Sequence, residues 1–171
     1  INNKGLLYSD RIPKDVYYYY KDAWRQDIPV LHIASRDWTH RSGVQHGKAP
    51  VPLPVKVYTN LPEVELFIDG KSLGKQKTEN YTVTFQVPFS RKKHFISVQA
   101  ENKESDQSIS MIEDALHINF TPIPANLNET NLRNLELAVN VGSNCFYTSD
   151  ESQLTWLPDQ PYTESSWGYI G

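Results

Sequence analysis

The chain has 171 residues, of which 39% are hydrophobic, 12% aromatic and 22% charged, a composition typical of a folded globular protein rather than a disordered chain. Its 17 basic and 20 acidic residues leave a net charge of −3, which argues against a nucleic-acid-binding surface. No apolar stretch approaches the roughly 20 residues needed to cross a bilayer. Cys145 is the single cysteine, which excludes an intrachain disulfide and a thiolate-rich zinc site. We therefore expect no nucleic acid, membrane, metal or cofactor as a partner.

The N-terminal segment carries a helix pattern. Pro13 and Asp15 suit a helix start, because proline lacks an N–H that would be unpaired there and a carboxylate favours the positive end of the helix dipole. We predict a helix over residues 13–25. Side chains spaced three and four residues apart form an aromatic stripe on one face of this helix, and the stripe must pack against another part of the protein. The stripe consists of Tyr17, Tyr20, Lys21 and Trp24.

From Val30 to about Asn119 the pattern changes to short alternating runs separated by turn residues. This pattern is typical of a β-sandwich, whose strands point alternate side chains into the core. The predicted strands cover residues 30–34, 55–58, 63–68, 81–87, 95–100 and 115–120.

Turn residues divide the predicted strands. Asp69-Gly70 predicts a two-residue hairpin turn with positive φ angles. Residues 42–54 contain two glycines and three prolines, and we predict an exposed loop there. The polar stretch 102–110 predicts a second loop.

The region after Phe120 indicates a boundary. Residues 121–134 contain two prolines and four asparagines without apolar periodicity, which is typical of a linker. The 37 residues from Leu135 onward begin as an alternating strand and then become rich in aromatic residues. A segment of this length is too short to form a core of its own.

Three strings resemble parts of family-two glycoside hydrolases. GLLYSDRIPKDVYYYYKDAW resembles the last strand-to-helix unit of the catalytic barrel, and PVLHIASRDWTHR with VKVYTNLPEVELFIDGKSLGK resembles the immunoglobulin-like domain that follows the barrel in bacterial β-galactosidases. VNVGSNCFYTSDESQLTWLPDQPY and SSWGYIG resemble the opening of a malectin-like carbohydrate-binding domain. The barrel pattern R-x-P-K-D-x-Y-Y-x-Y-K-x-x-W is carried by Arg11, Pro13, Lys14, Asp15, Tyr17, Tyr18, Tyr20, Lys21 and Trp24.

The resemblance implies a mainly β architecture. It consists of an immunoglobulin-like β-sandwich preceded by one α-helix from the end of a TIM barrel and followed by a truncated second β-sandwich. The implied parts are the barrel end (1–28), the sandwich (29–120), a linker (121–134) and the start of the malectin-like domain (135–171).

The resemblance also implies a function. The chain would be a non-catalytic C-terminal accessory region of a retaining β-galactosidase that hydrolyses terminal β-galactosides, with the barrel of the same chain and a glycan as partners. The sandwich would serve as a structural spacer. β-Glucuronidases and β-mannosidases share the family, and a periplasmic or extracellular location is implied as well.

The acidic residues of the chain do not form an obvious catalytic pair. A retaining glycosidase needs two carboxyl groups about 5 to 5.5 Å apart, and the resemblance places both glutamates in segments that this sequence does not contain. Glu63 and Glu65 alternate on what we expect to be a solvated strand face. Asp15 is expected to cap the helix or to pair with Arg11 or Lys14. We expect no hydrolysis by this chain alone.

Two groups of residues could contact sugar. Trp38, His40 and Arg41 could lie at the barrel rim, and the alternative is that Trp38 packs under a loop while the other two face solvent. His32 is expected to point outward from its strand or to lie satisfied in an interface.

The C-terminal segment combines aromatic faces with a carboxylate, which suits stacking on a sugar ring and hydrogen bonding to it. The alternative is that these aromatics form the core of an incomplete sandwich. The candidate residues are Trp156, Asp159, Tyr162, Trp167 and Tyr169.

Two further functions remain open from the sequence. The chain could belong to a free-standing carbohydrate-binding protein without hydrolase activity. It could also be an adhesion-type immunoglobulin-like module, although this leaves the helix and the terminal aromatics unexplained.

Overall fold

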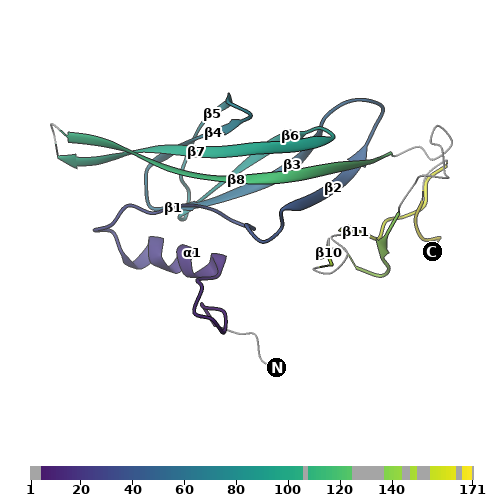
Figure 1. Cartoon of the computed structure of the whole chain (residues 1–171), viewed down its shortest axis with the longest axis horizontal. Helices are drawn as coiled ribbons and strands as arrows, with labels where there is room; N and C mark the ends of the chain where they lie inside the picture. Colours follow the sequence, from purple (N-terminus) through teal and green to yellow (C-terminus); the bar gives the residue numbers. More distant parts are fainter. Residues whose placement is uncertain are drawn as a thin grey trace. The chain divides into compact units, whose positions relative to one another are not determined.

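The computed structural model describes residues 5–105, 108–124, 137–143, 147–149, 155–164 and 167–170. Strands dominate these residues, which confirms the predicted mainly β class with a sandwich after one helix (Figure 1). The elements in chain order are α1 (Asp15–Trp24), β1 (Leu31–Ile33), β2 (His40–Gln45), β3 (Val51–Thr59), β4 (Glu63–Ile68), β5 (Lys71–Lys77), β6 (Thr82–Phe89), β7 (Lys92–Ser105), β8 (Ser108–Pro124), β9 (Val139–Asn140), β10 (Tyr147–Thr148) and β11 (Thr155–Pro158).

The chain divides into two compact units. The first comprises Ile1–Asp37, Pro54–Val87 and His94–His117, and the second comprises Trp38–Leu53, Pro88–Lys93 and Ile118–Gly171. Four long strands, β3, β6, β7 and β8, contribute residues to both units.

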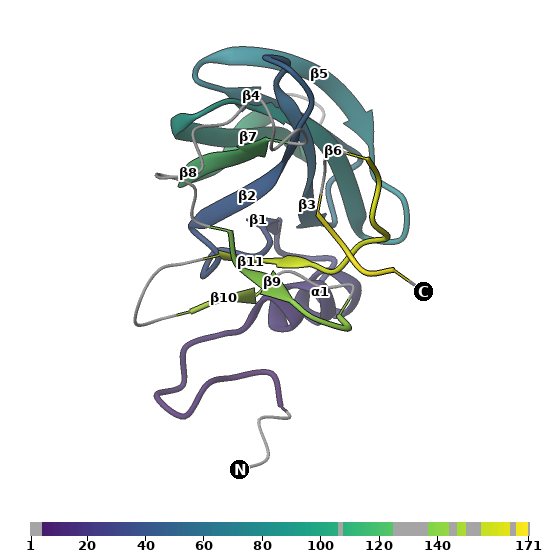
Figure 2. The same ribbon diagram turned by 90° about the vertical axis from the view of Figure 1, so that its right-hand side faces the viewer.

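The first unit is the body of the sandwich. One sheet has the order β1-β3-β6, and the other places β5, β4, β7 and the first part of β8 side by side (Figure 2). Buried residues alternate with exposed or half-buried ones along β4, β6 and β7, as expected for strands with one face on a core. The inward side chains are aliphatic or aromatic, and they include Val55, Val57, Val64, Leu66, Val83, Phe85, Ile96 and Val98.

The Asp69-Gly70 turn is confirmed. Both residues have positive φ angles, 52° and 80°, and Ile68 pairs with Lys71 directly across the turn. The Asp69 carboxylate accepts hydrogen bonds from the Phe95 backbone N–H (3.0 Å) and from Nδ1 of His94 (2.8 Å), a histidine that is 2% exposed. The hairpin tip is thus tied to β7.

The predicted loop over residues 42–54 is wrong. Strand β2 pairs in parallel with the end of β8, and β3 begins at Val51, so only a short turn separates them. Gly43 is required by packing, because a Cβ there would lie 2.8 Å from Cγ1 of Val51. Pro52 and Pro54 lie on the exposed side of β3, where the strand tolerates them.

The predicted loop over residues 102–110 is also wrong for the residues that the structure describes. β7 continues to Ser105 and β8 begins at Ser108. The polar side chains of this hairpin end are exposed or half-buried, so its strands are specified by backbone pairing and not by a hydrophobic face.

Helix α1 begins two residues later than predicted. Pro13 forms an isolated bridge with Leu7, and the Lys14 N–H donates to the Leu6 carbonyl, which keeps this segment extended. The aromatic stripe is largely uncovered, since Tyr20 and Trp24 are 38% and 70% exposed and their ring centres lie 5.0 Å apart.

The second unit contains a small sheet with the order β10-β11-β9. β11 pairs with β10 in an antiparallel and with β9 in a parallel orientation. Ile123, Leu157 and Trp167 form its buried cluster. Residues 125–136 and Cys145, which include most of the predicted linker, lie outside the described residues.

Candidate functional site

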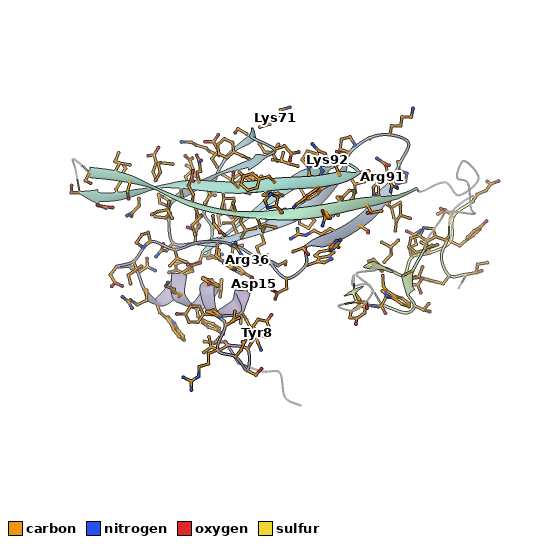
Figure 3. The ribbon with its side chains drawn as sticks, viewed as in Figure 1. Tyr8, Asp15, Arg36, Lys71, Arg91 and Lys92 are labelled. Carbon is orange, nitrogen blue, oxygen red and sulfur yellow. The ribbon has the colours of Figure 1, made fainter. Side chains whose placement is uncertain are left out.

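The inner face of α1 forms a polar joint with the sandwich. Nε2 of His32, on β1, donates to Oδ1 of Asp15 at 2.8 Å, and the Ser35 backbone N–H donates to Oδ2 at 2.6 Å. The Tyr18 ring stacks on the His32 imidazole with centroids 3.7 Å apart and an interplanar angle of 6°. Figure 3 shows Asp15 on the side of the helix toward the strands, near Arg36. The helix is therefore clamped to β1 by one carboxylate.

The electrostatics of Asp15 follow from these contacts. Burial alone would raise its pKa, but the hydrogen bonds from His32 and Ser35 outweigh burial and hold the pKa below its ordinary value. The hydrogen bonds to Asp15 come from groups in and after β1, which its place at the helix start did not indicate. His32 is 4% exposed and hydrogen-bonded within an interface, which is one of the two predictions made for it.

Asp22 lies on the same face of α1 as Asp15, two helical turns further along. Its side chain is fully buried, and neither carboxylate oxygen has a hydrogen-bond partner among the described residues. Burial raises the pKa of Asp22 to about 7, with a small opposing effect from Lys21. Sequence reasoning missed this residue, although its seven-residue spacing from Asp15 was a signal that both face the same way.

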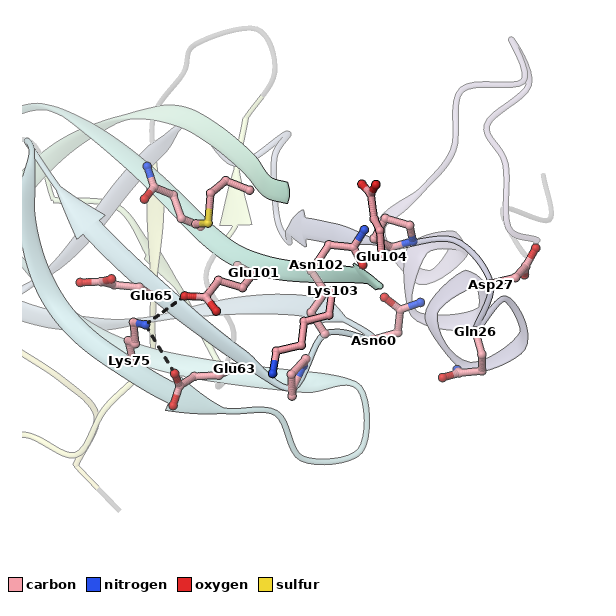
Figure 4. A pocket seen from close by; sticks show the side chains of 16 residues that line it. Gln26, Asp27, Asn60, Glu63, Glu65, Lys75, Glu101, Asn102, Lys103 and Glu104 are labelled. Carbon is pink, nitrogen blue, oxygen red and sulfur yellow. Dashed lines mark ion pairs between the residues drawn. The ribbon is translucent and has the colours of Figure 1, made fainter. Parts of the chain in front are cut away.

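A polar groove lies on the first unit, between the α1–β1 connection and the outer face of the β5-β4-β7 sheet (Figure 4). Its volume is about 770 Å³. Nζ of Lys75 lies 3.7 Å from Oε2 of Glu63 and 3.9 Å from Oε1 of Glu101, which joins three strands by ion pairs. The other charged lining residues are Asp27, Glu65, Lys103 and Glu104.

This groove is rich in charge and poor in flat apolar surface. Glu63 and Glu65 lie on the outer strand face, as the sequence indicates, and Glu63 is paired with a lysine. No aromatic side chain lines the groove, so it lacks the stacking surface that sugar sites commonly use.

The three residues proposed for a barrel rim lie in the second unit. Nε of Arg41 donates to the Trp38 carbonyl at 3.1 Å, and its guanidinium carbon lies 5.0 Å from the Trp38 ring centre. Nδ2 of Asn119 donates to Nε2 of His40 at 3.1 Å. The expectation that Arg41 faces solvent is wrong, since it is 2% exposed.

The five C-terminal candidates fall into two environments. Trp167 is 8% exposed in the cluster of the second unit, whereas Trp156, Tyr162 and Tyr169 expose between 39% and 54% of their surface. Tyr162 and Tyr169 are neighbours through the hydrogen bond from the Tyr162 N–H to the Tyr169 carbonyl, 2.8 Å long.

Asp159 stabilises the loop around these aromatics. Its Oδ2 accepts the Gly142 N–H at 2.9 Å, and its Oδ1 accepts the Gln160 N–H at 3.0 Å. Both oxygens of the carboxylate thus accept backbone hydrogen bonds, a role that the sequence alone does not indicate.

Within the described residues, no group of three or more histidine, cysteine, aspartate or glutamate side chains is placed to hold a metal ion. None of the helices in that part of the chain is long and apolar enough to cross a membrane.

Comparisons with known proteins find similarity to glycoside hydrolases. Residues 51–91 match a family described as a domain of unknown function, DUF4982. The β-glucuronidase of Bacteroides fragilis is 35% identical over 83 residues, 48% of this chain and 11% of that protein. The β-galactosidase of Bacteroides ovatus is 33% identical over 88 residues, 50% of this chain and 9% of that protein.

A solved structure matches over the whole chain. The crystal structure of Bacteroides uniformis β-glucuronidase superposes with a TM-score of 0.90 and 71% identity, covering 100% of this chain and 20% of that one. The chain thus spans about a fifth of this relative. It resembles the C-terminal region of family-two glycoside hydrolases.

Proposed function

We propose that the chain is the non-catalytic accessory region of a retaining β-glucuronidase, in which the sandwich is a structural spacer for a catalytic barrel. The observation that carries this proposal is the 71% identity with a β-glucuronidase over the entire chain. The matches to the Bacteroides fragilis enzyme support glucuronides over the galactosides that the sequence resemblance first implied.

Helix α1 is the element through which the barrel would be supported. Its inner face is clamped to β1 by Asp15 and His32, while Tyr20 and Trp24 on its other side are exposed. We assign this exposed stripe to the barrel of the same polypeptide, which would sandwich the helix between two domains. Burial of two large aromatics would make that contact stable.

Hydrolysis by the product of the complete reading frame tests the proposal. The complete protein is expected to cleave p-nitrophenyl β-glucuronide and the 171-residue chain is expected to cleave nothing. A β-galactosidase is the second candidate, supported by the Bacteroides ovatus relative, and faster cleavage of the β-galactoside would favour it. Cleavage of either substrate by the 171-residue chain would refute the accessory role.

We further propose that the exposed aromatics of the second unit contribute to sugar binding. Trp156, Tyr162 and Tyr169 are exposed near the loop that Asp159 orders, while Trp167 is buried in the cluster with Ile123 and Leu157. Calorimetric titration with glucuronate-containing oligosaccharides should show binding that Trp156→Ala weakens at least tenfold. Tyr20→Ala, an exposed aromatic of the first unit, should leave binding unchanged, and equal losses in both variants would contradict the assignment.

Sugar binding by the complete protein without hydrolysis would indicate a different class, a free-standing carbohydrate-binding protein. The two classes are separated by the same pair of measurements.

A further inference from the structure

The contact between α1 and the β1-β3-β6 sheet includes one acidic side chain that nothing neutralises. Asp22 has no exposed surface, and both of its oxygens lack hydrogen-bond partners among the described residues. An ionised carboxylate in such a place is unfavourable, because burial removes its hydration and no donor replaces it.

The surroundings of Asp22 show that it lies within the joint. Asp15 and Asp22 are separated by two helical turns, and Asp15 contacts His32 on β1. Between them, Tyr19 contacts Tyr58 of β3 with ring centres 5.6 Å apart. The pKa of Tyr58, on β3, is raised mainly by its burial and to a smaller extent by the charges of Asp15 and Asp22.

The other titratable groups of this interface do not offset the cost of ionising the Asp22 carboxyl. His32 donates to Asp15, and burial raises the pKa of Tyr58, which keeps its hydroxyl uncharged. Lys21 is the cation that acts on Asp22, and its effect is smaller than that of burial.

We propose that Asp22 makes the joint between α1 and the sandwich pH-dependent, so that the joint is tight when this carboxyl is protonated and loosens when it ionises. The device concerns the attachment of the helix to the sandwich and does not depend on the proposed hydrolase function. Loosening would free the helix from β1 and β3 while leaving the sandwich core intact.

The sign of the effect follows from the pKa of about 7, which lies above the ordinary value of 3.8. The joined state holds the proton more tightly than the open state, so opening becomes more favourable as pH rises from about 4 to 7 and levels off above 7. Between pH 5 and pH 7 the opening equilibrium constant is expected to rise on the order of 50-fold if opening fully exposes the group.

Amide hydrogen exchange of α1 in the 171-residue chain tests the proposal. Exchange rates of the helix amides, corrected for the intrinsic pH dependence of exchange, should give an opening constant that rises over this range. Asp22→Asn and Asp22→Ala, two variants that differ in size and polarity, should both abolish the rise. Asp27→Asn is the matched control, because Asp27 is solvent-exposed and paired with Arg25.

The contact between His32 and Asp15 is a second possible source of a slope of the same sign, since a charged imidazole binds a carboxylate more strongly than a neutral one. His32→Gln separates the two sources and should keep the slope. A slope that persists in both Asp22 variants, or the absence of a slope in the unmodified chain, would overturn the proposal.

Discussion

Nε2 of His32 donates to Oδ1 of Asp15 at 2.8 Å, and this hydrogen bond connects the only helix of the described residues to the first strand of the sandwich. The imidazole is 6% exposed and the carboxylate 36%, so the pair is shielded on one side. The same imidazole is stacked on Tyr18. A carboxylate thus orients a histidine whose ring face serves as packing surface.

Replacing Asp15 with alanine should weaken this joint. Hydrogen bonds to a charged group contribute about 1.5–3 kcal/mol, and partial exposure of Asp15 favours the lower end of that range. We expect a loss of about 1–2 kcal/mol in the free energy of unfolding, measured by urea denaturation at pH 7. Asp10→Ala, at an exposed turn before the helix, is the control and should cost less.

The pH dependence of this loss has a defined sign. The pKa of Asp15 is lowered in the folded chain, so its contribution is present above the unfolded value near 4 and is lost as pH falls through the folded value. The difference between the unmodified chain and Asp15→Ala should therefore shrink in acid. A difference that grew below pH 4 would contradict this account.

The Asp69 turn offers a separate test within the first unit. Asp69 has a φ of 52° and its carboxylate binds His94 and the Phe95 N–H. Alanine would lose both hydrogen bonds and fit the left-handed conformation poorly, with an expected cost of about 2–4 kcal/mol. Asparagine tolerates that conformation and keeps one acceptor, so Asp69→Asn should cost clearly less in the same denaturation experiment. Equal losses would assign the effect to charge and not to the turn.

The sequence predicts most of the sandwich because its strands have one solvent-exposed face and one buried face. Val64, Leu66 and Ile68 alternate with polar or half-buried neighbours, and this period marks β4 without any tertiary information. β2 was missed because its glycine is dictated by contact with Val51, which lies eight residues away, and glycine alone indicates a loop. Strand pairing can override local turn chemistry in this way.

The residues of the candidate sites are harder to predict. The aromatic stripe of α1 was visible in its spacing, but the opposite face of the helix carries Asp15 and Asp22, whose partners or lack of partners depend on β1 and β3. Arg41 was expected on the surface because charged residues are seldom buried, and its stacking on Trp38 could not be inferred from their separation of three residues in a non-helical segment.

Gly168 tests the local structure around the C-terminal aromatics. Its φ is 148°, and a Cβ there would lie 2.2 Å from the Gln160 carbonyl oxygen. Gly168→Ala should therefore shift the backbone between Tyr162 and Tyr169 at a cost of about 1–3 kcal/mol. Proteolysis of the second unit should accelerate accordingly.

Gly142 provides the control for that substitution. It also has a positive φ, 75°, but no atom lies within 4 Å of a Cβ built there. Gly142→Ala should cost only the left-handed strain of about 1–2 kcal/mol. If both variants are cleaved at the same rate, the contact with Gln160 is not what requires glycine at position 168.

Substitution of Trp24 should affect the stability of this chain and that of the complete protein differently. It is 70% exposed, so Trp24→Ser should change the unfolding free energy of the 171-residue chain by no more than about 0.5 kcal/mol. In the complete protein, where the stripe is proposed to pack on the barrel, the same change should remove a buried aromatic and cost about 3 kcal/mol or more. Phe85→Ala, at a core position 1% exposed, should cost about 3–5 kcal/mol in both contexts. If Trp24→Ser remains neutral in the complete protein, the stripe is not the contact with the barrel, and the support of the barrel must be sought on another surface of the first unit.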